Sequence, residues 1–124
     1  MFRSVSFHNF KALENFSLVL RRTNVLVGPN NAGKSTVLDG FRALAAAVRY
    51  ARRYRPLPIS GPAGKRMLGY QIPMSTIPIS TANIHSHYED TETQVVFSMA
   101  VSAWSCSLMR MPLAGFVSMP TLAR

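Results

Sequence analysis

Apolar and polar residues interchange in short runs over the first part of the chain, a pattern typical of strands with one buried face. Residues 2–7 and 16–20 each show it, and residues 8–15 between them read as a turn. A tight basic turn at 21–23 leads into residues 24–27, Asn-Val-Leu-Val, whose apolar run is typical of a buried strand. The pattern predicts an initial antiparallel hairpin followed by a third, buried strand.

The period of the pattern then changes. Residues 37–44 carry apolar side chains at helical spacing. The stretch 56–80 is rich in Pro, Gly and Ser, so we expect a loop insertion there. Residues 94–98 return to a strand pattern. Strands and a helix in this order predict the α/β class.

The junction between the expected third strand and the helix carries the most specific motif of the chain. Residues 28–36 match the phosphate-binding loop pattern G-x-x-x-x-G-K-[S/T] at every required position. A strand before the loop and a helix after it are the context that this pattern requires. The predicted nucleotide-binding residues are Gly28, Pro29, Asn30, Asn31, Ala32, Gly33, Lys34, Ser35 and Thr36.

The residue types in this loop suit the chemistry of a triphosphate. Gly28 and Gly33 permit positive φ and a close approach of the backbone to phosphate oxygens. The first amides of the helix add N–H donors and the positive end of the helix dipole. We expect Lys34 to reach the β- and γ-phosphates, the Ser35 hydroxyl to bind Mg²⁺, and Thr36 to contact the backbone or the α-phosphate. The predicted ligands are therefore ATP and Mg²⁺.

A second stretch with glycines and a lysine does not meet the pattern. Residues 61–66 have too few residues between the two glycines, and Arg66 stands where the Mg²⁺-binding hydroxyl belongs. No apolar strand leads into it, and prolines lie nearby. We interpret it as a basic loop.

The sequence around the phosphate-binding loop resembles a known family. Residues 7–13, Phe-His-Asn-Phe-Lys-Ala-Leu, together with residues 24–41, resemble the N-terminal lobe of the ABC-type ATPases. Within these the chain is most similar to the RecF, SMC and OLD group of DNA-associated ATPases, often described as AAA-family ATPases. The similarity covers residues 2–50 well and 70–98 loosely, and the pair Asn30-Asn31 is typical of the OLD-like branch.

This resemblance implies a P-loop NTPase N-terminal lobe with antiparallel N-terminal strands. It places Lys11 beside the nucleotide, where it approaches the triphosphate; a solvated lysine in a turn is the alternative, and both stay open. In the family two ATPase heads sandwich ATP. The implied partners are therefore a second head or a C-terminal lobe, and DNA.

The carboxylates that ATP hydrolysis requires lack their expected context. The acidic residues are Glu14, Asp39, Glu89, Asp90 and Glu92. None of them follows an apolar run, as a Walker B carboxylate would, and no Leu-Ser-Gly-Gly signature is present. Residues 1–98 therefore predict a partial lobe with an incomplete sheet, truncated and unable to hydrolyse ATP alone. Whether the chain is an enzyme stays open. Asp39, early in the helix, is expected to compensate the helix dipole.

Residues 99–124 form an atypical tail. From residue 101 onward the chain has no acidic residue but contains its only Trp and its only Cys. An altered reading frame and an ordinary packed segment would each explain this composition. A membrane-associated segment is disfavoured, because the 15 uncharged residues 95–109 fall short of the roughly 20 that span a bilayer.

Charge gives a second interpretation of function. The formal net charge is +9, which suits a nucleic-acid partner. Six basic residues cluster after the helix, interleaved with Tyr50 and Tyr54: Arg49, Arg52, Arg53, Arg55, Lys65 and Arg66. DNA contact by this cluster and a solvated helix end both stay open. The alternative function is a basic, non-catalytic DNA-binding module, or a remnant without function.

Two further features concern the location of the protein. One cysteine allows no internal disulfide, which suits a reducing compartment. Charged residues interrupt the first 20 positions, so no apolar signal core is present there. We expect a cytoplasmic location.

Overall fold

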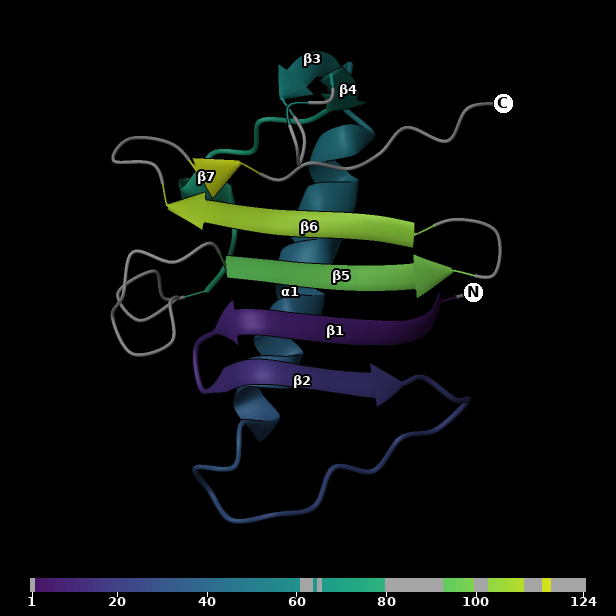
Figure 1. Ribbon diagram of the computed structural model, residues 1–124, viewed down its shortest axis with the longest axis vertical. Coiled ribbons are helices and arrows are strands. Elements are labelled where there is room, and N and C mark those ends of the chain that lie inside the picture. The colour runs from purple at the N-terminus through teal and green to yellow at the C-terminus, as the bar shows by residue number, and fades with distance from the viewer. Residues whose placement is uncertain are drawn as a thin grey trace.

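The protein forms two layers, a sheet and a long α-helix that lies against one face of it (Figure 1). The computed structural model describes residues 2–60, 64, 66–79, 93–99, 103–110 and 115–116, the last two ranges by their backbone. The α/β class expected from the sequence is confirmed in this coarse form, as a mixed fold with antiparallel strands.

The sheet is built around the first strand. The described strands of this sheet follow the order β2-β1-β5-β6-β7, and every neighbouring pair is antiparallel. Val5 of β1 faces Leu18 of β2 on one side and Phe97 of β5 on the other. The N-terminal hairpin expected from the sequence is therefore confirmed, and β5, far away in the sequence, covers its other edge. The bounds are β1 Phe2–Phe10, β2 Leu13–Val19, β5 Thr93–Met99, β6 Ala103–Arg110 and β7 Gly115–Phe116.

The connection between β1 and β2 is shorter than the sequence pattern predicts. Phe10 pairs with Leu13, so the turn consists of Lys11 and Ala12. Both Asn9 and Lys11 adopt positive φ, at 50° and 51°. The hydroxyl of buried Thr93 donates a hydrogen bond of 2.9 Å to the Asn9 carbonyl. This contact from β5 holds the bend at the end of β1.

Helix α1 spans Lys34–Ala51 and is longer at both ends than its apolar pattern predicts. It begins after Gly33, whose φ of 80° is incompatible with the helix. Its buried face is made mostly of small residues, which lets the helix lie close to the sheet. The buried residues of α1 are Thr36, Val37, Gly40, Ala43, Leu44, Ala46 and Ala47.

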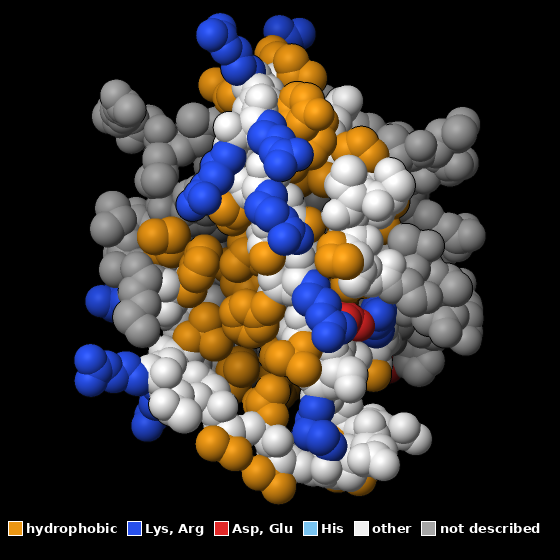
Figure 2. Space-filling model, turned by 180° about the vertical axis from the view of Figure 1, so that it is seen from behind, with side chains coloured by type: hydrophobic (Ala, Val, Ile, Leu, Met, Phe, Trp, Pro, Cys, Tyr) orange, Lys and Arg blue, Asp and Glu red, His pale blue; other side chains and the backbone are white. Residues whose placement is uncertain are grey.

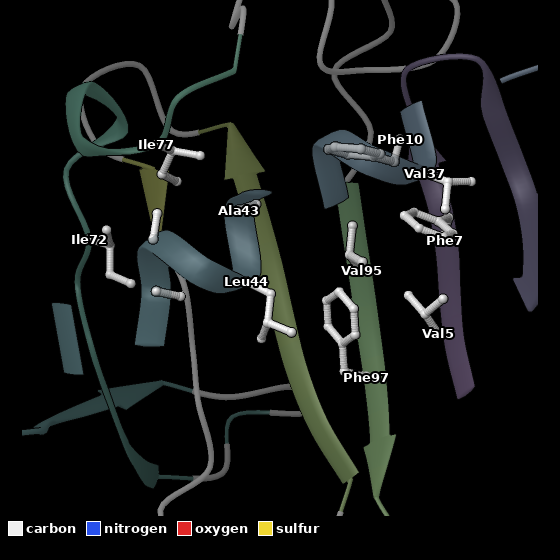
Figure 3. Close-up of a cluster of buried hydrophobic side chains, with 12 residues drawn as sticks. Val5, Phe7, Phe10, Val37, Ala43, Leu44, Ile72, Ile77, Val95 and Phe97 are labelled. Carbon is white, nitrogen blue, oxygen red and sulfur yellow. The ribbon is translucent and has the colours of Figure 1, made fainter. Parts of the chain in front are cut away.

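The hydrophobic core fills the space between α1 and the sheet (Figure 3). Inward-facing side chains of β1 and β5 meet the apolar face of α1, and the alternate residues of these strands are more exposed. The ring of Phe97 lies edge-on to that of half-buried Phe41, with 5.4 Å between centroids. The core residues of the two strands are Val5, Phe7, Phe10, Val95 and Phe97.

The stretch expected to be a loop insertion contains ordered elements. Strands β3 (Leu57–Ser60) and β4 (Arg66–Gly69) form a separate antiparallel hairpin. A 3-10 turn at Met74–Thr76 follows, flanked by buried Ile72 and Ile77, which join the core. Whether 56–80 is an insertion stays a prediction, but its second half anchors onto α1 and the sheet.

The expected third strand at residues 24–27 is wrong. Residues 24–27 form no strand, and Val25 and Val27 are 79% and 89% exposed. The Asn24 side chain explains the departure from the sheet. It accepts a hydrogen bond from the Arg21 amide and donates one to the Val19 carbonyl, which bends the chain away at the end of β2. No described strand lies beside this segment.

The described backbone of the tail continues the sheet through β6 and β7. A domain boundary near residue 98 and an altered reading frame both stay predictions. Within the part of the chain described by the structure, no helix is long and apolar enough to cross a membrane.

Close packing at Gly40 gives a first prediction. A Cβ at this position would lie 2.5 Å from Cε1 of Phe7, a fully buried ring. Gly40→Ala should therefore lower the free energy of unfolding by up to about 2 kcal/mol, since overpacking costs about 1–3 kcal/mol and the helix propensity of Ala returns only about 1. Urea unfolding followed by circular dichroism measures this.

The reverse change at exposed Ala45 is the control. Ala45→Gly should cost about 1 kcal/mol through helix propensity alone. Stabilisation of the protein by Gly40→Ala would contradict the close contact with Phe7.

Candidate functional site

The predicted phosphate-binding loop connects the exposed segment after β2 to the start of α1 and lies on the surface. Residues 28–32 are exposed. The Ala32 amide donates a hydrogen bond of 3.1 Å to the Pro29 carbonyl, which closes a turn through Asn30 and Asn31. A Cβ on Gly28 would lie 3.2 Å from the Ala32 side chain, so the two ends of this turn approach closely.

Gly33 is required at the end of the loop for two reasons. Its φ of 80° lies in the left-handed region that favours glycine. In addition, a Cβ at Gly33 would lie 2.8 Å from Cδ2 of Leu13, at the start of β2. The second glycine of the motif thus allows the loop to turn into α1 while it packs against the hairpin.

The first turn of α1 presents backbone donors without a side-chain cap. Gly33, at the N-cap, offers no side chain, and the first turn contains no acidic residue. The first amides of any α-helix lack intrahelical acceptors and carry the positive end of the dipole. Ser35 is exposed, whereas Thr36 is 7% exposed and packs into the core side of the helix. The Ser35 hydroxyl is therefore the accessible one.

The Lys34 amine folds back over the loop. Its Nζ donates hydrogen bonds to the carbonyls of Gly28 and Pro29. A lysine ammonium carries three donors, so these two bonds leave one N–H for an anion. The arrangement fixes the amine against the loop backbone.

Lys11 lies in a charged cluster rather than in solvent. Its Nζ is 2.6 Å from Oδ2 of Asp39, and the two side chains are only 17% and 14% exposed. Arg42 approaches the other oxygen of Asp39 at 2.8 Å. Of the two alternatives for Lys11, the solvated lysine in a turn is therefore contradicted, and the approach to a triphosphate stays a prediction. The expectation that Asp39 compensates the helix dipole is wrong too. Asp39 lies in the second turn of α1 and forms ion pairs with Lys11 and Arg42.

The environment of Asp39 affects its ionisation in two opposite directions. Burial of the carboxyl raises its pKa, and the hydrogen bonds from Lys11 and Arg42, with their positive charges, lower it. The cations prevail, so the pKa of Asp39 lies below its ordinary value. The carboxylate is therefore ionised at neutral pH and holds Lys11 onto the helix.

The structure brings most of the predicted site residues together. Contacts within residues 28–36 define the loop, and the contact of Gly33 with Leu13 places the β1–β2 turn next to it. Sequence reasoning missed this role of Leu13 and the pairing of Asp39 with Lys11, which are 28 positions apart. No local pattern signals such a pair. Lys65, from the second glycine-containing stretch, lies outside the described residues, as do Glu89, Asp90 and Glu92.

Comparison with known proteins gives one result. A family model described as "AAA ATPase domain" matches residues 1–96. The match covers β1, β2, the loop, α1 and most of β5. No curated protein and no solved structure matches the chain.

The cluster around Asp39 leads to a prediction about pH. Asp39→Asn should lower the free energy of unfolding at pH 7 by about 1–3 kcal/mol, because hydrogen bonds to charged groups contribute about this much. The folded pKa is lowered, so the contribution is present above the unfolded pKa of about 3.9 and is lost as pH falls through the folded pKa. Unfolding curves between pH 3 and pH 7 measure the difference.

A double-mutant cycle with Lys11→Met supplies the control. The two changes should be non-additive, because each removes the same ion pair. A destabilisation by Asp39→Asn that stays constant down to pH 3 would contradict the ionised pair.

Proposed function

The chain belongs to the AAA ATPase domain family, and from this premise we propose that it binds ATP with Mg²⁺ through residues 28–36. The observation that carries the proposal is the Lys34 amine, held on the Gly28 and Pro29 carbonyls next to the uncapped start of α1. A cation, orphan amides and a glycine turn converge there. Together they form the donor set that triphosphate oxygens require.

Each residue contributes a different part of the binding. The first amides of α1 would donate to phosphate oxygens, and the remaining N–H of Lys34 would reach the same group. Gly28 is exposed and leaves the backbone around it accessible, whereas Gly33 is buried against Leu13 and turns the loop into α1. Asn30 and Asn31, exposed at the tip of the turn, line the rim of the site.

The donors present are compatible with Mg²⁺ as a companion of the nucleotide. This ion prefers oxygen ligands and retains several waters. The exposed Ser35 hydroxyl would supply one ligand and the phosphates others, and no protein cage is needed. When bound, the ion neutralises phosphate charge.

Lys11 is a second cation near the loop. Its ion pair with Asp39 ties the β1–β2 turn to α1, so its charge stays fixed beside the first turns of the helix. We include Lys11 in the proposed nucleotide site, as a group that approaches the triphosphate without leaving Asp39.

We propose that the chain binds ATP but does not hydrolyse it alone. In the described residues, Asp39 is engaged with two cations and Glu14 is exposed at the start of β2. Neither is placed to hold an attacking water beside the loop. Hydrolysis would then need a carboxylate from outside the described residues, such as one from a second ATPase head or from a further lobe.

Within the family, the motifs favour a finer placement. The segment Phe7–Leu13 and the pair Asn30-Asn31 support the RecF, SMC and OLD group. In the structure the first of these motifs forms the end of β1, the turn, and Leu13 at the start of β2, which lies against Gly33.

Titration with a fluorescent ATP analogue and Mg²⁺ tests the proposal. Lys34→Ala should weaken binding by at least about tenfold, because it removes a charge-assisted bond to phosphate, worth about 1.5–3 kcal/mol. Arg22→Ala, which removes an exposed charge before the loop, should bind as the unchanged protein does. Equal binding by Lys34→Ala and the unchanged protein would refute the site.

Lys34→Ala could weaken binding by disturbing the loop itself, because its amine holds the loop carbonyls. Two variants at Ser35 test the same site without removing this amine. Ser35→Thr retains a hydroxyl and should keep the enhancement of binding by Mg²⁺, whereas Ser35→Ala should lose it. Mg²⁺ enhancement that persists in Ser35→Ala would exclude this hydroxyl as a ligand.

A further inference from the structure

The C-terminal end of α1 carries a basic surface that the nucleotide site does not use. Four exposed arginines form it, on the last turn of the helix and just beyond it: Arg49, Arg52, Arg53 and Arg55. None of these four arginines forms an ion pair with a described residue. The ion pairs among the described residues are those of Asp39 with Lys11 and with Arg42. The sequence from 40 to 88 contains no acidic residue. We call these four residues the arginine end.

The helix dipole does not account for this accumulation of charge. One cation in the last turn is enough to complement the dipole, and Arg49 occupies that turn. Arg52, Arg53 and Arg55 follow the last helical residue, Ala51. Mutual repulsion makes such a cluster unfavourable unless it meets an anion.

The arginines continue a line of positive charge along the outer face of α1. Arg42 and Arg49 lie seven positions apart within α1, a spacing that places them on one face of the helix, about 10 Å apart along its axis at 1.5 Å per residue. Arg53 follows just beyond the last helical residue. Figure 2 shows Lys and Arg side chains following the helix on the side away from the sheet.

Two stacked aromatic rings lie within the arginine end. The centroids of Tyr50 and Tyr54 are 4.2 Å apart and their planes differ by 24°. The Tyr54 amide donates to the Tyr50 carbonyl at 3.1 Å, so the backbone fixes the stack. Tyr54 is 55% exposed. Its ring thus offers a preformed aromatic surface between guanidinium groups.

The β3–β4 hairpin lies at the same end of the molecule (Figure 1). Arg66, exposed at the start of β4, adds a further cation. The hairpin therefore enlarges a surface that combines arginines with an open aromatic ring.

We propose that the arginine end binds single-stranded nucleic acid, with the arginines on phosphates and Tyr54 stacked on a base. Aromatic stacking between cations is the usual way in which proteins bind unpaired strands. In a duplex the base faces are covered, so the open ring favours a single strand. The inference does not depend on ATP binding, because the loop lies at the other end of an 18-residue helix, about 27 Å away.

Fluorescence anisotropy of a labelled 20-nucleotide oligothymidylate, titrated with the full chain, tests this proposal. Two double variants are compared, and each removes two exposed arginines that are adjacent in the sequence. One pair lies in the arginine end, and the other lies before the loop, at the opposite end of the molecule. Arg52→Ala with Arg53→Ala should weaken binding at least about tenfold, and Arg21→Ala with Arg22→Ala less than about twofold. With four phosphate contacts, a plot of the logarithm of the binding constant against the logarithm of the salt concentration should have a slope of about −3. Loss of two contacts in Arg52→Ala with Arg53→Ala should make this slope about 1.4 shallower.

Substitutions at Tyr54 test the stacking. Tyr54→Ala should weaken binding at least about fivefold, while Tyr54→Phe, which keeps the ring, should bind normally. Equal losses in the two arginine pairs, or unchanged binding by Tyr54→Ala, would overturn the proposal. Tighter binding to phosphatidylserine vesicles than to the oligonucleotide would assign the surface to a membrane instead and also overturn it.

Binding of the ATP analogue, measured on the same samples, separates this inference from the proposed function. The variant Arg52→Ala with Arg53→Ala should retain analogue binding. Oligonucleotide binding as expected, without any analogue binding by the unchanged protein, would refute the nucleotide site alone.

Discussion

The close approach of α1 to the β1–β2 hairpin is the constraint on which the other features depend. Two glycines make it possible, Gly33 against Leu13 and Gly40 against Phe7. With a side chain at either position the helix would have to move away from the hairpin. The distance between α1 and the hairpin sets the position of the loop, of the first amides of α1 and of the Lys11–Asp39 pair. Packing and the proposed nucleotide site are therefore consequences of the same contacts.

Helix α1 also separates two charged regions. Its N-terminal end combines orphan amides, Lys34 and the Asp39 cluster, in which the carboxylate neutralises part of the positive charge. Its C-terminal end has arginines without an ion pair among the described residues. The first region suits a compact, highly charged anion, and the second suits an extended one. The two regions lie at opposite ends of an 18-residue helix and have no residue in common.

The sequence was sufficient to predict elements whose pattern is local. Alternation predicted β1, a short strand-like run predicted β5, helical spacing predicted α1, and the fixed spacing of Gly28, Gly33 and Lys34 predicted the loop. It failed where burial depends on a distant partner. The apolar run at 24–27 has the composition of a buried strand, but a strand needs a neighbour, and the Asn24 side chain turns this segment away from β2. The pairing of Lys11 with Asp39 could not be predicted, because it arises only when the hairpin packs on α1.

Amide hydrogen exchange with and without ATP and Mg²⁺ would show where on the chain the nucleotide binds. If the loop and the first turn of α1 bind the triphosphate, exchange at residues 30–36 should slow markedly when nucleotide is added. Exchange in β3 and β4 should stay unchanged, because the hairpin lies at the far end of the helix (Figure 1). Nucleotide that leaves residues 30–36 unprotected, or that protects only the residues around the arginine end, would contradict the account.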